Sequence, residues 1–294
     1  MARQSSGASD VSAASNEYEL RHVQLLDRCR AYLPVAPAGF RFSHLTAALL
    51  YRMPLPPHLE SGTDIHVSVP ASAQPPRMRG VIGHRLDSQL DSQLDSQLDS
   101  RPDSTPERTP TSAVLHGLPL VPPEVAWLQI AAILTLDDLI VAGDHLLRRK
   151  RPASTLARLR EAVAGLRGQR GAVLARAATL DIRSGTDSPM ETRMRLALIR
   201  AGLPEPVVGH TVKDADGFFV GTPDLCYTVE KVALEYEGDI HRTSRQTFRD
   251  DIERREQFEE IGWRVIRVTA DHLRRPHGFV TRVATLLRER ARAG

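Results

Sequence analysis

A polar, glycine-containing segment at residues 183–187 separates two parts of the 294-residue chain that differ in sequence pattern. The part before it is predicted to be mainly helical. The part after it reads as helix, three-stranded meander, helix, strand and helix, which is typical of a compact α/β layout. We therefore expect an α/β (α+β) protein with a tail at residues 1–16, an N-terminal region at 17–183 and a C-terminal domain at 188–294.

The N-terminal region is expected to combine helices with one small β-hairpin. Apolar residues recur at helical spacing within residues 17–32, and Ser43 is suited to cap a helix that reaches residue 52. Residues 64–69 alternate as a half-exposed strand, with 79–85 as the expected partner. A strand near 114–120 and helices near 122–134, 136–147, 154–166 and 171–180 follow. The basic cluster 148–151 is expected to complement a helix dipole.

A tandem Leu-Asp-Ser-Gln repeat occupies residues 86–100, and a Pro/Ser/Thr-rich stretch continues it to residue 112. An amphipathic helix is one interpretation, because leucine recurs every four residues. That period drifts around a helix of about 3.6 residues per turn, and Asp and Ser are weak helix formers. We therefore expect a disordered insertion at 86–112 in a surface loop.

The composition limits the class of protein. The chain is 41% hydrophobic and 26% charged, which suffices for a folded core. No apolar run approaches the ~20 residues of a membrane span, and the first residues lack a signal-peptide core. Cys29 and Cys226 have no metal-ligand spacing. These features predict a soluble cytoplasmic protein that does not bind membranes.

Acidic residues in the C-terminal domain indicate a candidate metal site. Asp224 lies within a predicted strand pair, and alternation places Glu235 and Glu237 on one face of the next strand. We expect these three carboxylates to converge at one edge of the sheet. Such oxygen ligands select Mg²⁺ or Mn²⁺, which activates water and stabilises charge at phosphorus.

The order of these motifs resembles that of the PD-(D/E)XK nuclease superfamily. More narrowly, residues 188–287 are similar to the very-short-patch-repair-like endonuclease domains, known as the domain of unknown function 559. The resemblance rests on Pro223-Asp224, Glu235-Tyr236-Glu237-Gly238-Asp239-Ile240-His241, Asp251-Ile252-Glu253-Arg254, Phe258 and Gly262-Trp263-Arg264-Val265-Ile266-Arg267. It implies a restriction-endonuclease-like core in which helices flank a mixed sheet.

The resemblance also implies roles for individual residues. Glu191 matches the family's helical acid, which binds metal-bound water or a ligand. Asp224 matches the central metal-binding aspartate and Glu235 the second acidic ligand, so the implied cofactor is Mg²⁺ or Mn²⁺. As an ordinary alternative, Glu191 is a charge that stabilises the first turn of its helix.

The remaining implied residues include one departure from the family pattern. Glu237 stands where the wider superfamily has a lysine, and Lys231 is four residues upstream of Glu235. His241 matches a histidine suited to proton transfer, with a loop residue as the alternative. Asp251 and Arg254, three residues apart, would support the site, with Arg254 in the cationic role of the missing lysine. The alternative for Arg254 is a surface ion pair with a nearby aspartate.

These assignments predict a divalent-metal-dependent DNA endonuclease, in DNA repair or in defence against phages and mobile elements. Arg242, Arg245, Arg249 and Arg254 would contact DNA phosphates. The segments Phe42–Ala48, Asp64–Pro70 and Gly117–Val121 of the N-terminal region are similar to abortive-infection type IV antitoxin-like regions that precede this nuclease domain in actinobacterial proteins. A cognate toxin or repair protein is accordingly an expected partner. Two alternatives stay open: a non-catalytic, DNA-binding antitoxin-type regulator with a vestigial site, and a partner-binding protein that uses the 136–180 helices.

Overall fold

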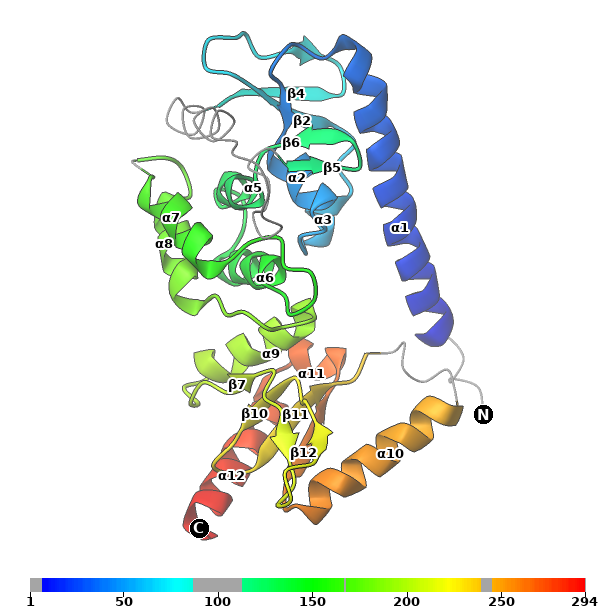
Figure 1. Ribbon diagram of the computed structural model, residues 1–294, viewed down its shortest axis with the longest axis vertical. Coiled ribbons are helices and arrows are strands. Elements are labelled where there is room, and N and C mark those ends of the chain that lie inside the picture. Colours follow the sequence, from blue (N-terminus) through cyan, green and yellow to red (C-terminus); the bar gives the residue numbers. More distant parts are fainter. Residues whose placement is uncertain (1–6, 87–112, 167, 239–244, 294) are drawn as a thin grey trace. The chain divides into compact units, whose positions relative to one another are not determined.

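A computed structural model describes residues 7–86, 113–166, 168–238 and 245–293, and it has an α+β fold (Figure 1). The chain divides into two compact units. Unit 1 consists of Met1–Asn16, Leu147–Arg151 and Arg183–Gly294, and unit 2 consists of Glu17–Leu146 and Pro152–Ile182. The short segment Leu147–Arg151 therefore belongs with the C-terminal residues.

None of the helices in the described part of the chain has both the length and the apolar character needed to cross a bilayer.

Within the described residues, unit 2 contains a six-stranded mixed sheet of order β3-β4-β2-β1-β6-β5. Its strands are β1 (Arg41–Phe42), β2 (Ile65–Val69), β3 (Arg77–Met78), β4 (Val81–Arg85), β5 (Ala113–Leu115) and β6 (Leu118–Leu120). Residues 64–69 and 79–85 are paired as predicted, as β2 and β4, but the two strands are parallel, so the prediction that they form a hairpin is wrong. Ser68 is fully buried although it is polar, so β2 is covered on both faces, as suits a central strand.

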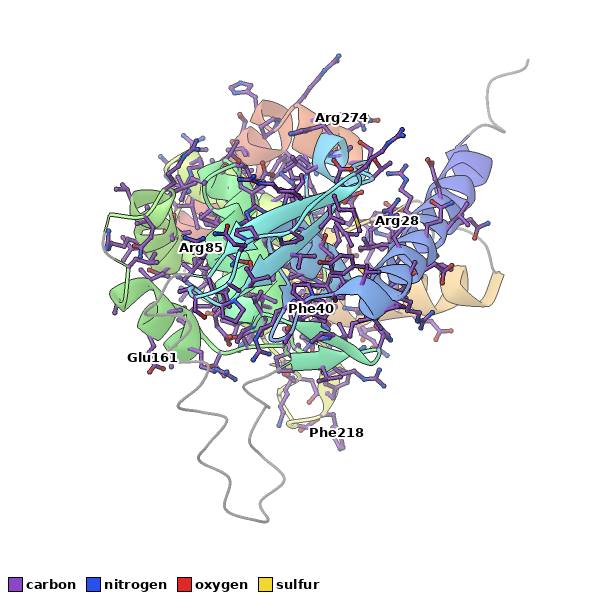
Figure 2. The ribbon with its side chains drawn as sticks, turned by 90° about the horizontal axis from the view of Figure 1, so that it is seen from above. Arg28, Phe40, Arg85, Glu161, Phe218 and Arg274 are labelled. Atoms are coloured by element: carbon purple, nitrogen blue, oxygen red, sulfur yellow. The ribbon has the colours of Figure 1, made fainter. Side chains whose placement is uncertain are left out.

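Helices complete unit 2. They are α1 (Gly7–Tyr32), which starts in unit 1, the 3₁₀ turn η1 (Leu33–Val35), α2 (His44–Leu50), α3 (Pro57–Glu60), α5 (Pro123–Ile130), α6 (Leu136–Leu146), α7 (Leu156–Ala164) and α8 (Ala172–Asp181). The indole N–H of buried Trp127 donates to Leu139 O at 2.9 Å and ties α5 to α6. Phe40, labelled in Figure 2, packs its ring edge-to-face against Tyr32 and Phe42.

Two boundaries differ from the predicted ones. Helix α1 begins at Gly7 rather than at residue 17, because alanines at 8, 13 and 14 favour the helical state. Leu86, assigned to the repeat, is only 4% exposed, and its N–H donates to Val69 O at 2.9 Å. It is therefore part of the core, whereas the rest of the predicted insertion, residues 87–112, lies outside the described residues.

Unit 1 is built around a four-stranded sheet of order β12-β11-β10-β7, within the described residues. The strands are β7 (Val207–Val208), β10 (Leu225–Tyr227), β11 (Val232–Tyr236) and β12 (Arg264–Val268), and a separate pair consists of β8 (Val212–Lys213) and β9 (Phe219–Gly221). Strand β11 is antiparallel to β10 and parallel to β12, so the sheet is mixed. Phe218, at the turn before β9, is exposed and points outward in Figure 2.

Helices cover both faces of this sheet (Figure 1). They are α9 (Pro189–Arg200), α10 (Arg245–Glu260), α11 (Ala270–Arg274) and α12 (His277–Ala293). Met194 of α9 and Phe279 of α12 pack with Leu225 and Leu234 on one face. Phe258 of α10 packs with Cys226 and Ala233 on the other face. The predicted order of helix, meander, helix, strand and helix is present, but within the described residues the meander consists of five short strands, β7 to β11, rather than three, and the short helix α11 was not predicted.

A close helix contact in unit 2 provides a test of the fold. A Cβ added at Gly143 would lie 2.4 Å from Ile182 Cδ1. Gly143→Ala should therefore lower the free energy of unfolding by about 1–3 kcal/mol through overpacking. The double variant Gly143→Ala/Ile182→Ala should lose less free energy of unfolding than the sum of the losses in the two single variants. We expect this difference, the coupling free energy, to be about 1 kcal/mol or more. Chemical unfolding of the four proteins measures this coupling. Strict additivity would contradict the packing of α6 against Ile182.

Candidate metal and phosphodiester site

The β10–β11 register brings two predicted site residues together in unit 1. Leu225 pairs with Leu234 in an antiparallel ladder, so the next position places Asp224 opposite Glu235. The backbone N–H of Tyr236 donates to Asp224 Oδ2 at 2.7 Å. This hydrogen bond orients the Asp224 carboxylate at the point where β10 begins and β11 ends.

Both acids lie on the sheet face that α10 covers. Asp224 shares its face with Cys226, and Glu235 shares its face with Ala233, because alternate residues of a strand point the same way. Cys226 and Ala233 pack against Phe258 of α10. The carboxylates are therefore placed beside this helix.

Arg254 of α10 is the cation that meets them. Its Nη2 lies 2.7 Å from Glu235 Oε1 and donates to the carbonyl of Thr222 at 3.2 Å. The guanidinium also lies 6.0 Å from the centre of the Phe258 ring. The Nε atom is buried without a hydrogen-bond partner among the described residues. Arg254 thus pairs with a predicted metal ligand, whereas the side chains of Asp250 and Asp251 on its own helix lie outside the described set.

Glu191 approaches Asp224 from the first turn of α9. The side chain is 6% exposed; Oε2 accepts the Asp187 N–H at 2.9 Å, and the Glu191 N–H donates to Ser188 Oγ at 3.2 Å. The predicted ordinary role at a helix start is therefore present. Burial, followed by the charge of Asp224, raises the pKa of Glu191 to about 7.

Asp224 itself carries an unfavourable charge. Burial raises its pKa and Asp187 adds to the effect, whereas the Tyr236 hydrogen bond and the charges of Arg254 and Arg149 lower it without cancelling the rise. Two neighbouring carboxyl groups with raised pKa values mark a place where burial disfavours the ionised carboxylates more than the nearby hydrogen bonds and arginines favour them. A bound cation would stabilise the ionised forms.

Arg149 and Asp187 are members of the site that the sequence did not reveal. Arg149 Nε donates to Asp187 Oδ2 at 2.9 Å, and a second, shorter contact is made by Nη2. Arg149 was expected to complement a helix end, but it lies within the segment Leu147–Arg151 of unit 1. Arg149 is 75 positions from Asp224 in the sequence, so no local pattern predicts that it lies near this site.

Glu237 and Lys231 have other partners. Glu237, directly after β11, lies 3.7 Å from Arg267 Nη1 of β12 and on the same face as Glu235. Lys231 precedes the opposite end of β11, where its Nζ donates to Ile261 O at 3.1 Å. Lys231 therefore lies at the other end of β11 from the acidic pair, and Arg254 is the cation that the described residues place beside Glu235.

The other predicted residues cannot be placed in the site. His241 and Arg242 lie outside the described residues. Arg245, Arg249 and Asp251 belong to α10, but their side chains are outside the described set. Their roles remain predictions.

The three carboxylates of Asp224, Glu235 and Glu237 do not form a compact set of three metal ligands. Among the residues that the structure describes, one group of three does, with all ligand atoms within 4.8 Å of one another: His44, His66 and His84 of unit 2. A metal ion could therefore be held by histidines. At the acidic site the donors are the facing pair Asp224 and Glu235, with Glu191 beside Asp224.

Comparisons with known proteins found two relatives. Both are uncharacterized proteins of Mycobacterium tuberculosis, from strains CDC 1551 and H37Rv, and each is 30% identical to this chain over 171 residues. The aligned part covers 57% of this chain and 61% of each relative. No family model matches the chain, and no solved structure matches it.

The raised pKa of Glu191 predicts a pH-dependent stability. Its pKa is about 7 in the folded chain against an ordinary 4.5, so folding is increasingly disfavoured as the pH rises between these values. Glu191→Gln should remove this penalty, so that its stability advantage over the parent grows by up to about 3 kcal/mol from pH 4.5 to pH 7. Fluorescence of Trp263 in a Trp127→Phe background reports unfolding of unit 1.

Glu256→Gln is the matched control, because Glu256 is exposed on α10. It should leave the pH profile unchanged. An equal profile for Glu191→Gln and the parent would contradict the charged environment assigned to Glu191.

Proposed function

We propose that unit 1 hydrolyses DNA phosphodiester bonds with a divalent metal ion, Mg²⁺ or Mn²⁺, bound by Asp224 and Glu235. The observation that carries the proposal is the facing pair of these carboxylates beside the buried Glu191. Mg²⁺ commonly keeps several waters and takes one or two protein carboxylates, so a facing pair fits it without a third ligand. The raised pKa of Asp224 supports the fit, because a cation would stabilise its ionised form.

The residues around the proposed metal ion would have different roles in hydrolysis. When bound, the metal ion would activate water and stabilise charge that builds up at phosphorus. Tyr236 N–H orients Asp224, and Arg254 holds Glu235 through one of its two oxygens. Arg254 also supplies positive charge next to the reacting phosphate, and His241 is the group that the sequence offers for proton transfer.

An arginine-lined groove beside the site suits the DNA backbone. It has a volume of about 650 Å³ and lies between α10, the edge strand β12 and α12. Its arginines are Arg255, Arg264, Arg267 and Arg282, against one lining acid, Glu289. Glu259 pairs with Arg255 at 3.1 Å and lies 3.9 Å from Arg264, so part of this charge is already balanced. Forked guanidinium groups are well matched to phosphate oxygens.

A second function, a DNA-binding regulator without catalysis, is favoured by the ion pairs of the site. Arg254 neutralises Glu235, and Arg267 lies near Glu237, so a large part of the acidic charge is balanced by the chain itself. This function corresponds to an antitoxin-type protein with a vestigial nuclease site. A cleavage assay separates the two functions, because only the first breaks DNA strands.

The metal-dependent activity predicts nicking of supercoiled plasmid DNA in Mg²⁺ or Mn²⁺ and none in EDTA. Asp224→Asn and Glu235→Gln should each reduce the rate by at least about 100-fold, on the scale of losing a group that stabilises transition-state charge. Asp271→Asn is the control, since Asp271 is an exposed acid of the same unit that pairs with Arg274. DNA retention without strand breaks would favour the regulator. Cleavage that survives both site variants would contradict the assigned metal ligands.

The groove predicts a salt-dependent DNA affinity. Arg264→Gln and Arg282→Gln should each weaken binding to unrelated sequences alike and reduce the slope of log K against log salt by about 1. Fluorescence anisotropy at several salt concentrations measures both effects. Arg274→Gln, on an exposed residue of α11 labelled in Figure 2, should have no such effect. Equal slopes of log K against log salt for the parent and all variants would show that the groove does not contact DNA.

A further inference from the structure

Unit 2 brings three histidines together from three separate elements. His66 lies on β2 and His84 on the parallel neighbour β4, where His66 pairs with Ile82 and Ser68 pairs with His84. The two histidines therefore lie on the same face of the sheet, two residues apart in register. His44 is the first residue of α2, which contacts β2.

The rings are packed closely and face one another. His44 and His84 are stacked with centroids 3.6 Å apart, and His66 and His84 are nearly parallel with centroids 5.1 Å apart. His66 Nδ1 and His84 Nε2 are 2.9 Å apart, at hydrogen-bond distance. One nitrogen from each ring lies within 4.8 Å of the other two.

Buried polar groups fix the backbone around the cluster. Ser43 is fully buried, and its N–H donates to His66 O at 3.0 Å while its hydroxyl accepts from Ser68 Oγ at 2.8 Å. The same Ser43 hydroxyl lies 3.0 Å from His44 Nδ1, which leaves Nε2 of His44 as the nitrogen available to a ligand. Metal-binding histidines are usually oriented in this way, through a hydrogen bond at their other ring nitrogen.

The main chain of His44 is held in an uncommon conformation. Its φ is +50°, in the left-handed region, and its N–H donates to Gln129 Oε1 at 2.8 Å. A side chain other than glycine pays a cost in this region, and such residues cluster at ligand sites. The fold therefore holds His44 over the β2–β4 pair by bonds from two elements.

The three imidazoles are suited to act as neutral ligands. Burial, with smaller contributions from His84 and His66, lowers the pKa of His44 to about 3. Burial, with a smaller contribution from His84, lowers the pKa of His66 to about 4, although Asp64 acts in the opposite direction. Burial also lowers the pKa of His84. A neutral imidazole offers a nitrogen lone pair, which is the form that binds transition metals.

We propose that His44, His66 and His84 form a Zn²⁺ site in unit 2, with one nitrogen from each ring as a ligand. Zn²⁺ takes histidine nitrogens at about 2.0–2.1 Å in tetrahedral geometry, and three histidines leave one position for water or another ligand. Tetrahedral ligands at this distance are about 3.4 Å apart. The rings need to turn from their stacked positions to reach it, which the soft χ2 torsion of histidine allows. The site is separate from the acidic residues of unit 1 and does not depend on the proposed nuclease activity.

Metal binding by the full-length protein tests the site. After removal of metal with EDTA, titration calorimetry with Zn²⁺ should show one ion per chain, and Co²⁺ should give the visible absorption of a tetrahedral complex. His84→Gln and His66→Asn should each weaken Zn²⁺ binding by at least about 30-fold. His58→Gln is the control, because His58 is an exposed histidine of the same unit. Zn²⁺ should also raise the melting temperature of the parent and of His58→Gln.

The same titration in the Asp224→Asn protein removes any contribution from the acidic site, and it should give the parent affinity. Circular dichroism establishes that each variant is folded. Should both cluster variants fail to fold, the parent still decides the question through its stoichiometry and its Co²⁺ spectrum. A parent chain without Zn²⁺ binding, or folded His84→Gln and His66→Asn proteins that bind as tightly as His58→Gln, would overturn the proposal.

Discussion

The hydrogen bond from Tyr236 N–H to Asp224 Oδ2 fixes the geometry on which the proposed metal site of unit 1 depends. It ties the start of β10 to the end of β11 and so places Asp224 opposite Glu235 on the face that α10 covers. A shift of the register by one residue would turn these carboxylates to opposite faces. The apolar partners in the same ladder, Leu225 and Leu234, resist that shift because they are buried against α9 and α12.

Charge balance distinguishes this site from an ordinary strand end. Arg254 forms an ion pair with Glu235, and Arg149 donates a hydrogen bond to Asp187, yet the pKa values of Glu191 and Asp224 are both raised. The removal of water from these carboxyl groups thus raises their pKa values more than the nearby arginines lower them. A hard cation is the simplest addition that would lower the free energy of the ionised site. The buried Nε of Arg254 indicates that this arginine is held by packing against Phe258 as well as by its ion pair.

The sequence predicted much of unit 1 because its signals are local. Periodicity located α9, α10 and α12, and alternation placed Glu235 and Glu237 on one face. The sequence could not predict the contribution of Arg149, because Leu147–Arg151 joins unit 1 only through tertiary contacts. In unit 2 the single-hairpin prediction failed because the parallel pairing of β2 with β4 depends on the whole sheet. For the same reason the cluster of His44, His66 and His84 could not be predicted from the sequence.

The proposed nuclease activity depends on a divalent cation shared by Asp224 and Glu235. Crystals of the full-length protein grown with Mn²⁺ test it directly, since Mn²⁺ replaces Mg²⁺ at oxygen sites and scatters anomalously. We expect an anomalous difference peak between the carboxylate oxygens of Asp224 and Glu235, and no such peak in crystals of the Asp224→Asn protein. Clear density for both side chains with no peak between them, at saturating Mn²⁺, would contradict it.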